Sequence, residues 1–242
     1  MPRYRLIPRK PKLLLFNIAV LAIALQSFSL FGGTVPFGSW RYTIYQDTRE
    51  VGNAVIRRSM KMRKIHTSSE ISFFLADTFT VSRETIVEEG NFTPVSYSSE
   101  STFVTMDTVK RVTMSARVED DRLHVSDGSR TLTFNITKDL NFGSNILIAS
   151  LLKTGLKVES SGIINMYDPS VSPTKTIRTH MTCGDVEKVQ VGKHTALLHR
   201  IVVRHKNKVL YTMFCDKSGI VHKYVMSLGG RKLELILIAY DS

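Results

Sequence analysis

The chain lacks several motifs that would point to an enzyme. Its 242 residues contain no GxSxG, no HExxH, no P-loop and no Rossmann glycine pattern. These motifs supply a nucleophile elbow, paired zinc ligands or a phosphate cradle. No other set of acid, base and nucleophile converges in the sequence. We therefore expect a protein that is not an enzyme and has no cofactor.

Cysteine is scarce, with only Cys183 and Cys215. An even count outside the cytoplasm predicts a disulfide between them. Two free buried thiols are one alternative, and a metal site that adds His180 and His222 is another. Cys215 and His222 are too loosely spaced for a zinc signature, so we expect no metal site.

Acidic residues are missing from the beginning of the chain. Residues 1–12 contain five basic residues and no acid, and the stretch from Leu13 to Leu25 is apolar except for Asn17. This order is typical of a secretory signal, and counted to Phe31 the run is long enough to span a bilayer. A cleaved signal and an uncleaved anchor both fit. No cysteine lies near the segment, which excludes a lipoprotein anchor.

Charge and composition suggest how the chain is divided. We expect residues 1–12 to be cytoplasmic, 13–31 to be a signal peptide or transmembrane anchor, 32–39 to be a flexible linker, and 40–242 to be an extracytoplasmic β domain. The localisation is then periplasmic, with anchoring in the inner membrane if 13–31 is retained. The formal net charge of +12 favours anionic lipid surfaces. We expect no nucleic-acid partner.

Long helical patterns are also few, and most of the chain from Trp40 onward has a period of two. Ile56, Met60 and Met62 alternate with a basic set that includes Arg57 and Lys61. In the middle of the chain, alternation places seven apolar residues on one face of adjacent strands: Val112, Met114, Ala116, Val118, Leu132, Phe134 and Ile136. We expect this apolar face to be concave and partly accessible.

The stretch "NILIASLLKTG" differs from the rest. Asn145 fits a helix N-cap, and Gly155 fits the position after a helix C-terminus. We predict one short helix here that covers the concave face with Ile146, Leu147 and Leu151. Parallel sheets need helical crossovers, and too few helices are predicted for that. The expected fold is therefore mainly β: a curved antiparallel sheet or open half-barrel, with one short helix on its concave side.

The stretch "CDKSGIVHKY" brings a cysteine, an aspartate and a histidine close together in sequence. Asp216 and Gly219 are typical of a turn, so Asp216 is interpreted as a turn residue. Alternation places His222 on one face with Ile220, Tyr224 and Met226. Nothing in the spacing suggests a catalytic triad.

The order of these pieces resembles bacterial envelope proteins of unknown function with a half-barrel of the LolA/LolB lipoprotein-carrier type. The quoted pieces are "WRYTIYQDTREVGNAVI", "GNFTPVSY", "NILIASLL" and "VLYTMFCDKSGIVHKYVMSLGGRKLELIL". The resemblance implies a curved antiparallel sheet wrapped around a helix. In the lipoprotein carriers the concavity holds acyl chains, but no carrier signature at residue level is present.

Two functions therefore remain as expectations. The first is a non-catalytic envelope domain that binds an apolar ligand, such as a lipid or acyl chain, in its concave face. The alternative is a membrane-tethered interaction module of an envelope protein complex, with no small ligand.

Overall fold

The computed structural model describes residues 36–137, 140–142, 161–168, 172, 174–228 and 230–242. The described residues form strands and turns and contain no helix. Fifteen strands are present: β1 Gly38–Gln46, β2 Arg49–Lys61, β3 Lys64–Leu75, β4 Thr78–Glu89, β5 Pro94–Val104, β6 Val109–Glu119, β7 Arg122–Ser126, β8 Thr131–Asn135, β9 Leu140–Phe142, β10 Ser161–Tyr167, β11 Ile177–Val191, β12 His194–His205, β13 Lys208–Cys215, β14 Val221–Leu228 and β15 Arg231–Asp241.

All of these strands belong to one sheet with the order β8-β7-β6-β5-β4-β3-β2-β1-β15-β14-β13-β12-β11-β10-β9. Strands β1 to β8 follow one another as hairpins, and so do β11 to β15. The pairing of β1 with β15 joins the two series, and Trp40 lies opposite Tyr240 there. Neighbouring strands are antiparallel except for β9 and β10. The prediction of a largely antiparallel sheet is confirmed.

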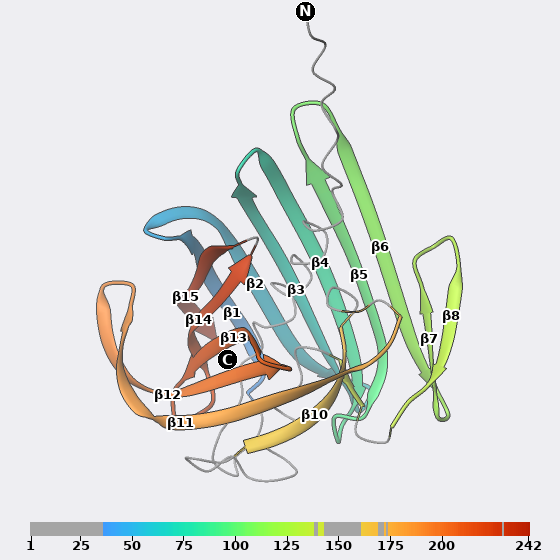
Figure 1. Cartoon of the computed structure of the whole chain (residues 1–242). Helices are drawn as coiled ribbons and strands as arrows, with labels where there is room; N and C mark the ends of the chain where they lie inside the picture. The colour runs from blue at the N-terminus through green and yellow to red at the C-terminus, as the bar shows by residue number, and fades with distance from the viewer. Residues whose placement is uncertain (1–35, 138–139, 143–160, 169–171, 173, 229) are drawn as a thin grey trace, which may run out of the picture.

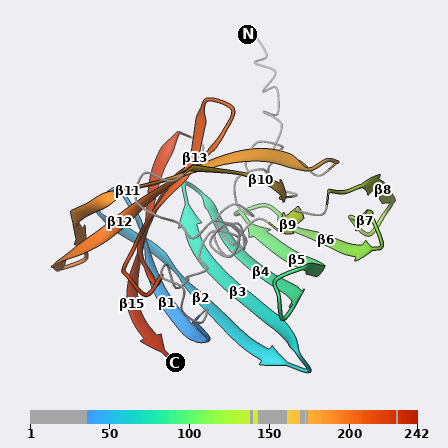
Figure 2. The same ribbon diagram turned by 90° about the horizontal axis from the view of Figure 1, so that it is seen from below.

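The sheet is rolled, so that its two halves face each other. Strands β10 and β11 arch across the lower part of the view toward β4–β6 (Figure 1). From below, β1–β6 lie on one side and β10–β13 on the other (Figure 2). Antiparallel strands with one apolar face can bury that face only against another layer, and here the other layer is the far half of the same sheet.

Apolar side chains from both halves form the main core. Each such side chain contributes roughly 1.5–3 kcal/mol when fully buried. Its largest fully buried members on the first half are Trp40, Tyr42 and Phe73. The second half contributes Met166, Met181, Ile201, Val203, Tyr211, Met213, Tyr224, Met226, Leu233 and Leu235.

The far edge of the sheet closes onto the inner face near β5. Leu140 and Phe142 of β9 and Tyr167 of β10 pack against Ile86, Tyr97, Ala116, Leu123 and Val125. The rings of Tyr97 and Phe142 have centroids 5.8 Å apart, and those of Phe142 and Tyr167 are 6.3 Å apart. This second cluster is separate from the main core.

Three predictions fall on residues outside those described. These are the cytoplasmic basic region at 1–12, the signal or anchor at 13–31, and the helix at 145–155 with Ile146, Leu147 and Leu151. In the portion of the chain that is described, there is no helix of the length and apolar character needed to span a bilayer. Strand β1 begins at Gly38, within the predicted 32–39 linker.

One face assignment made from alternation is wrong, that of β14. On β2, Ile56 is buried and Arg57 is exposed, as predicted; Arg58 is also buried on the inner face, and Met60 and Met62 are exposed where the strand ends. On β14, Val221 is fully buried, and His222 is displaced from the inner face. The cause is a β-bulge: Phe214 pairs with Lys223 and Cys215 with Val221, which leaves His222 as the additional residue.

Candidate functional site

The seven apolar residues predicted for the concave face lie on β6, on β8 and just after β8. Ala116 is buried in the second cluster, and the other six are half-buried. Strand pairing aligns Ala116 with Val125 and Leu132, and Val118 with Leu123 and Phe134. The ring of Phe134 lies 5.9 Å from that of Tyr167. The set therefore borders the second cluster and continues beyond it.

The degree of burial distinguishes this face from the rest of the interior. On β1 to β3 the inner apolar side chains, such as Tyr42, Ile56 and Ile71, are fully buried because the opposite half of the sheet covers them. On β6 and β8 the inner side chains stay partly accessible, because the β9 edge closes the sheet near β5. Half-covered apolar surface is the feature expected of a binding site or an interface.

Polar residues occupy the inner face of β4, which sequence analysis did not anticipate. Thr80, Ser82, Glu84 and Glu88 are all buried and alternate with outward residues. The hydroxyls of Ser82 and Ser101 lie 2.9 Å apart in a hydrogen bond. The signal was present as strict alternation in "TFTVSRETIVEE", but the inner set is mostly polar. A pattern search for an apolar inward face misses it.

Glu84 is the most unusual group of this interior. It is 3% exposed, and neither carboxyl oxygen has a hydrogen bond of good geometry among the described residues. Burial, and then the charge of Asp168, raises the pKa of Glu84 well above its usual value, while the nearby Tyr97 hydroxyl opposes the rise. A carboxyl held neutral in this way can both donate and accept a hydrogen bond.

A buried cation lies close to the same region. The Arg58 Nε donates a hydrogen bond of 3.2 Å to Thr67 Oγ1, and its guanidinium lies 5.8 Å from the centre of the Trp40 ring. Burial lowers the pKa of Arg58 to about 10, although the nearby Glu88 opposes this. The inner face therefore holds buried ionisable side chains on β2 and β4: Arg58, Glu84 and Glu88.

The two cysteines are free and buried, so the predicted disulfide is wrong. Cys183 lies on β11 and Cys215 on β13, with β12 between them. Strands in a sheet are about 4.8 Å apart, so residues two strands apart exceed the reach of a disulfide. Burial raises the pKa of both thiols, most strongly that of Cys215. They are poor nucleophiles in this setting.

The residues of the alternative metal site are not brought together on one face. His180 is exposed on the outer side of β11, whereas Cys183 faces inward. Within the described ranges no group of three or more His, Cys, Asp or Glu side chains could hold a metal ion.

Asp216 and His222 do meet, as parts of a turn. His222 Nε2 lies 2.8 Å from Asp216 Oδ2, and Asp216 also accepts hydrogen bonds from the main-chain nitrogens of Ser218 and Ile220. Burial alone would raise the pKa of Asp216, but hydrogen bonds from His222, Ser218 and Ile220 lower it. Cys215 points into the core instead. The turn interpretation of Asp216 is confirmed, and its pairing with His222 was missed because it depends on the bulge.

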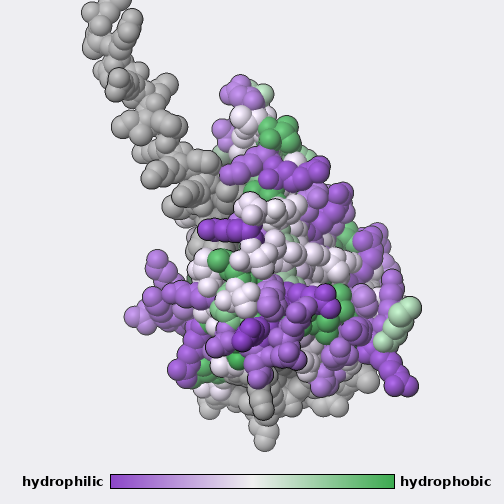
Figure 3. Space-filling view, turned by 90° about the vertical axis from the view of Figure 1, so that its right-hand side faces the viewer, coloured by the Kyte–Doolittle hydropathy of each residue, from purple (hydrophilic) through white to green (hydrophobic). Residues whose placement is uncertain are grey.

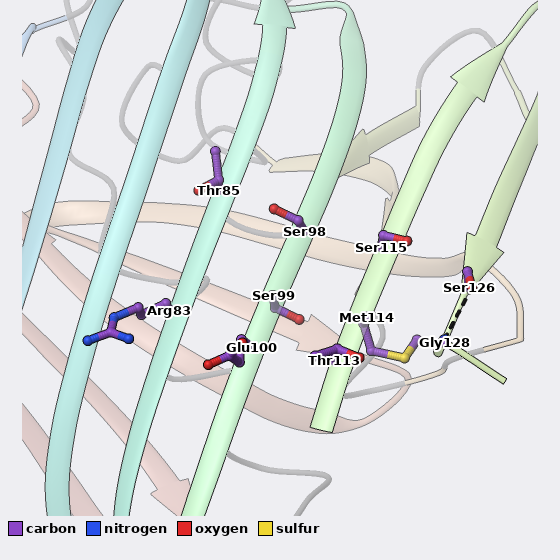
Figure 4. A pocket seen from close by; sticks show the side chains of 10 residues that line it. All are labelled: Arg83, Thr85, Ser98, Ser99, Glu100, Thr113, Met114, Ser115, Ser126 and Gly128. Atoms are coloured by element: carbon purple, nitrogen blue, oxygen red, sulfur yellow. Dashed lines mark hydrogen bonds between the residues drawn. The ribbon is translucent and has the colours of Figure 1, made fainter. Parts of the chain in front are cut away.

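The outer surface has a shallow polar pocket of about 380 Å³. Four of its hydroxyl groups come from one row of paired residues on β4 to β7: Thr85, Ser98, Ser115 and Ser126. Figure 4 shows them with Arg83 and Glu100 at one side. Arg83 is held by Glu70 at 3.0 Å, and Glu100 lies 3.7 Å from Arg111. The charges of the pocket are thus already paired, and the surrounding face is largely hydrophilic (Figure 3).

An apolar row lies on the outer face at the other end of the same strands. Phe74, Phe79, Val104 and Val109 are paired one after another across β3 to β6, and all are exposed. Phe74 also lines a groove of about 780 Å³ beside the β1–β2 turn. We call these four residues the outer apolar row.

The architecture and interior together define an all-β domain made of one open, rolled and mostly antiparallel sheet. Its fold is similar to that of the β-barrel-like protein of a domain of unknown function, DUF1849, from Brucella abortus. The TM-score is 0.62 at 15% identity, over 86% of this chain and 98% of that one. At this identity the likeness concerns the fold alone.

Other likenesses are much weaker. A protein described as exported, with a YmcC-like fold, from Bacteroides fragilis has a TM-score of 0.29 at 8% identity, over 89% of this chain and 100% of that one. LprF from Mycobacterium bovis has a TM-score of 0.23 at 8% identity, over 95% of this chain and 91% of that one. These scores are too low to support a comparison. No model of a protein family and no curated protein matches the sequence.

Proposed function

We propose that this chain is an extracytoplasmic, non-catalytic lipid-binding module that takes an acyl chain against the inner face of β6 and β8. The observation that supports the proposal most is the partial exposure of six inner apolar residues: Val112, Met114, Val118, Leu132, Phe134 and Ile136. An acyl chain laid along them would bury this surface and continue the second cluster.

The chemistry of the interior suits an amphipathic ligand. Met114 lies in one cross-strand row with Ser99 and Glu84, so the apolar face leads directly to the buried carboxyl. Because Glu84 is 3% exposed, its neutral carboxyl would hydrogen-bond an ester or hydroxyl group of a ligand only after binding had opened the inner face. Two buried carboxyls, Glu84 and Asp168, could also suggest acid–base catalysis. Both are 2–3% exposed, which disfavours direct access by a substrate.

The location follows from the beginning of the chain. The apolar run at 13–31 after a basic region supports export across a membrane, with the domain on the outer side. An envelope compartment would present lipid to such a domain. A diffusing carrier would result if the segment is cleaved, and a tethered one if it is kept.

Binding of a fluorescent fatty acid to the purified full chain tests the proposal, with displacement by unlabelled palmitic acid. Met114→Gln should weaken binding about tenfold, as expected for the loss of about 1.4 kcal/mol of apolar contact. Thr113→Gln, on the outer face of the same strand, is the matched control and should bind as the parent does. Thermal unfolding of each variant checks that it is folded.

Two outcomes would contradict the proposal. One is a folded parent protein that takes up no fatty acid and carries no lipid by native mass spectrometry. The other is equal binding by Met114→Gln and the parent, since the face named here would then not be the site.

A second candidate function is that of an interaction module in an envelope protein complex. The outer apolar row favours it, because four exposed apolar side chains in register form a surface that an apolar partner surface could cover. Phe79→Asp should abolish co-purification of such a partner from the membrane fraction. Fatty-acid binding should be unchanged in the same variant, which separates the two functions.

A further inference from the structure

The end of the β2–β3 hairpin is basic and apolar at once. Met60 is 49% exposed and Met62 is 98% exposed, and they alternate with the exposed Lys61 and Arg63. We call Met60–Arg63 the hairpin tip. Burying a methionine side chain is favourable, and a fully exposed methionine gains this free energy only when another surface covers it.

The backbone conformation of the tip does not favour the two residues that form its turn. Met62 and Arg63 both have positive φ, 49° and 63°. Two-residue hairpin turns of this kind prefer Asn-Gly, because side chains with a Cβ are disfavoured in this region. The tip thus retains a methionine and an arginine at positions where the local fold favours other residues.

The cations of the tip are available for an external partner. Arg57, Lys61 and Arg63 are exposed and make no salt bridge with any other described residue. The neighbouring Lys64 lies 3.4 Å from Glu89. Exposed cations around an apolar side chain match the surface of an anionic bilayer, where headgroup phosphates lie just outside the acyl chains.

The position of the hairpin tip near the start of β1 favours the same partner. Gly38, at the start of β1, pairs with Arg58, only three residues before the end of β2. The six residues 32–37 can span about 20 Å at most between the apolar run and β1. The ends of β2 and β15 point to the same side in Figure 2. A bilayer that holds residues 13–31 is therefore near the tip.

We propose that the hairpin tip is a contact surface for anionic phospholipid, with Met62 at the acyl boundary and Lys61 and Arg63 against headgroup phosphates. The contact would orient the rolled sheet on the membrane. This inference goes beyond lipid binding in the interior and does not depend on it.

The opposite end is the natural comparison. It contains the outer apolar row and Met106, which is also 98% exposed. There the apolar residues are interrupted by the exposed acids Asp77 and Asp107, which an anionic surface would repel. Met106 thus matches Met62 in residue type and exposure but not in the charge around it.

Tryptophan fluorescence in vesicles can measure the contact. The chain has a single tryptophan, Trp40, which is fully buried and supplies a constant background. The full-length Met62→Trp and Met106→Trp variants are each reconstituted with phosphatidylcholine vesicles that have brominated acyl chains, with and without phosphatidylglycerol. Emission from position 62 should shift to the blue and be quenched by the brominated lipid when phosphatidylglycerol is present. Emission from position 106 should not change.

A second set of variants separates charge from insertion. Lys61→Ser combined with Arg63→Ser in the Met62→Trp background should reduce the quenching, and so should added salt. Asp120→Asn combined with Asp121→Asn, in the acidic turn after β6, serves as a charge control and should not reduce it. Three results would each overturn the proposal. These are no quenching at position 62, equal quenching at positions 62 and 106, and quenching that changes neither with phosphatidylglycerol nor with the serine substitutions.

Discussion

The Tyr42 hydroxyl donates a hydrogen bond of 3.0 Å to the main-chain carbonyl of Val221, 179 positions along the chain. Tyr42 belongs to β1 and Val221 to β14, and both are fully buried. Only β15 separates β1 from β14 in the sheet, so the bond spans that strand on the inner face and joins the two series of strands. It also fixes the bulge at β14, because it holds the carbonyl of the residue just before His222.

Loss of this bond should be measurable. Tyr42→Phe should lower the free energy of unfolding by about 1–2 kcal/mol, since a buried carbonyl loses its donor. Tyr224→Phe is the matched control: its hydroxyl is buried with no hydrogen bond among the described residues, so its removal should be neutral or stabilising. Urea unfolding of both variants checks this. Equal destabilisation would mean that the Tyr42 bond contributes nothing specific.

Asp216 should make stability depend on pH on the acidic side. Its pKa in the folded state is lowered, so its contribution is present above the unfolded pKa and is lost as pH falls through the folded pKa. Asp216→Asn should cost about 1–2 kcal/mol at neutral pH, because charged hydrogen bonds to the turn are replaced. It should also flatten the stability curve below about pH 4. An unchanged acid limb in the variant would contradict this.

Glu84 should make the stability of the protein depend on pH in the opposite direction to Asp216. Its folded pKa is raised, so the wild-type protein should lose stability as pH rises above the unfolded value of about 4.3. Glu84→Met, which removes the charge at similar volume, should be more stable than the parent at pH 7 and should lack this decline. Chemical denaturation from pH 4 to pH 8 measures both curves. A destabilised variant at pH 7 would show that the carboxylate has a stabilising partner.

Gly52 should tolerate no side chain. A Cβ there would lie 2.0 Å from the carbonyl oxygen of Ser72 and 2.6 Å from Phe73 Cα on β3. Gly52→Ala should thus force β2 and β3 apart and cost about 3 kcal/mol. Gly184→Ala, where the nearest atom would be 3.5 Å away, is the control and should change stability by less than about 1 kcal/mol. Thermal unfolding of the two variants makes the comparison.

The thiols should be hidden and unpaired. The native protein should react slowly with a thiol reagent, because Cys183 and Cys215 are buried and their pKa values are raised. Denaturation without a reductant should then release two reactive thiols per chain. If no thiol appears until a reductant is added, the cysteines are bridged and the strand order assigned here is wrong.

Parts of the fold could be predicted from the residues because the signal is local. The alternation is strict from Val112 to Val118 and from Leu132 to Ile136, and these seven residues share the inner side of β6, β8 and the residue just after β8. The Asp216 turn could be predicted because Asp and Gly occupy the positions that a turn requires. The antiparallel arrangement followed from the short connections between strands.

Other parts could not be predicted, because they depend on what lies opposite. The inner face of β4 is polar, so the rule that buried faces are apolar assigned it no role. A single additional residue at the β14 bulge reversed the faces of Val221 and His222. The disulfide failed because two cysteines in neighbouring regions of the sequence ended on strands that are not adjacent.

The sequence by itself determined the strands, their turns and the alternation of their faces, since these depend on backbone preferences and on neighbours within a few residues. Only the tertiary structure decided how the two halves of the sheet meet. Pairing of β1 with β15 and closure of β9 near β5 are contacts between distant residues. They determine which apolar faces are fully buried, which remain half-covered on β6 and β8, and why Glu84 and Arg58 are inside.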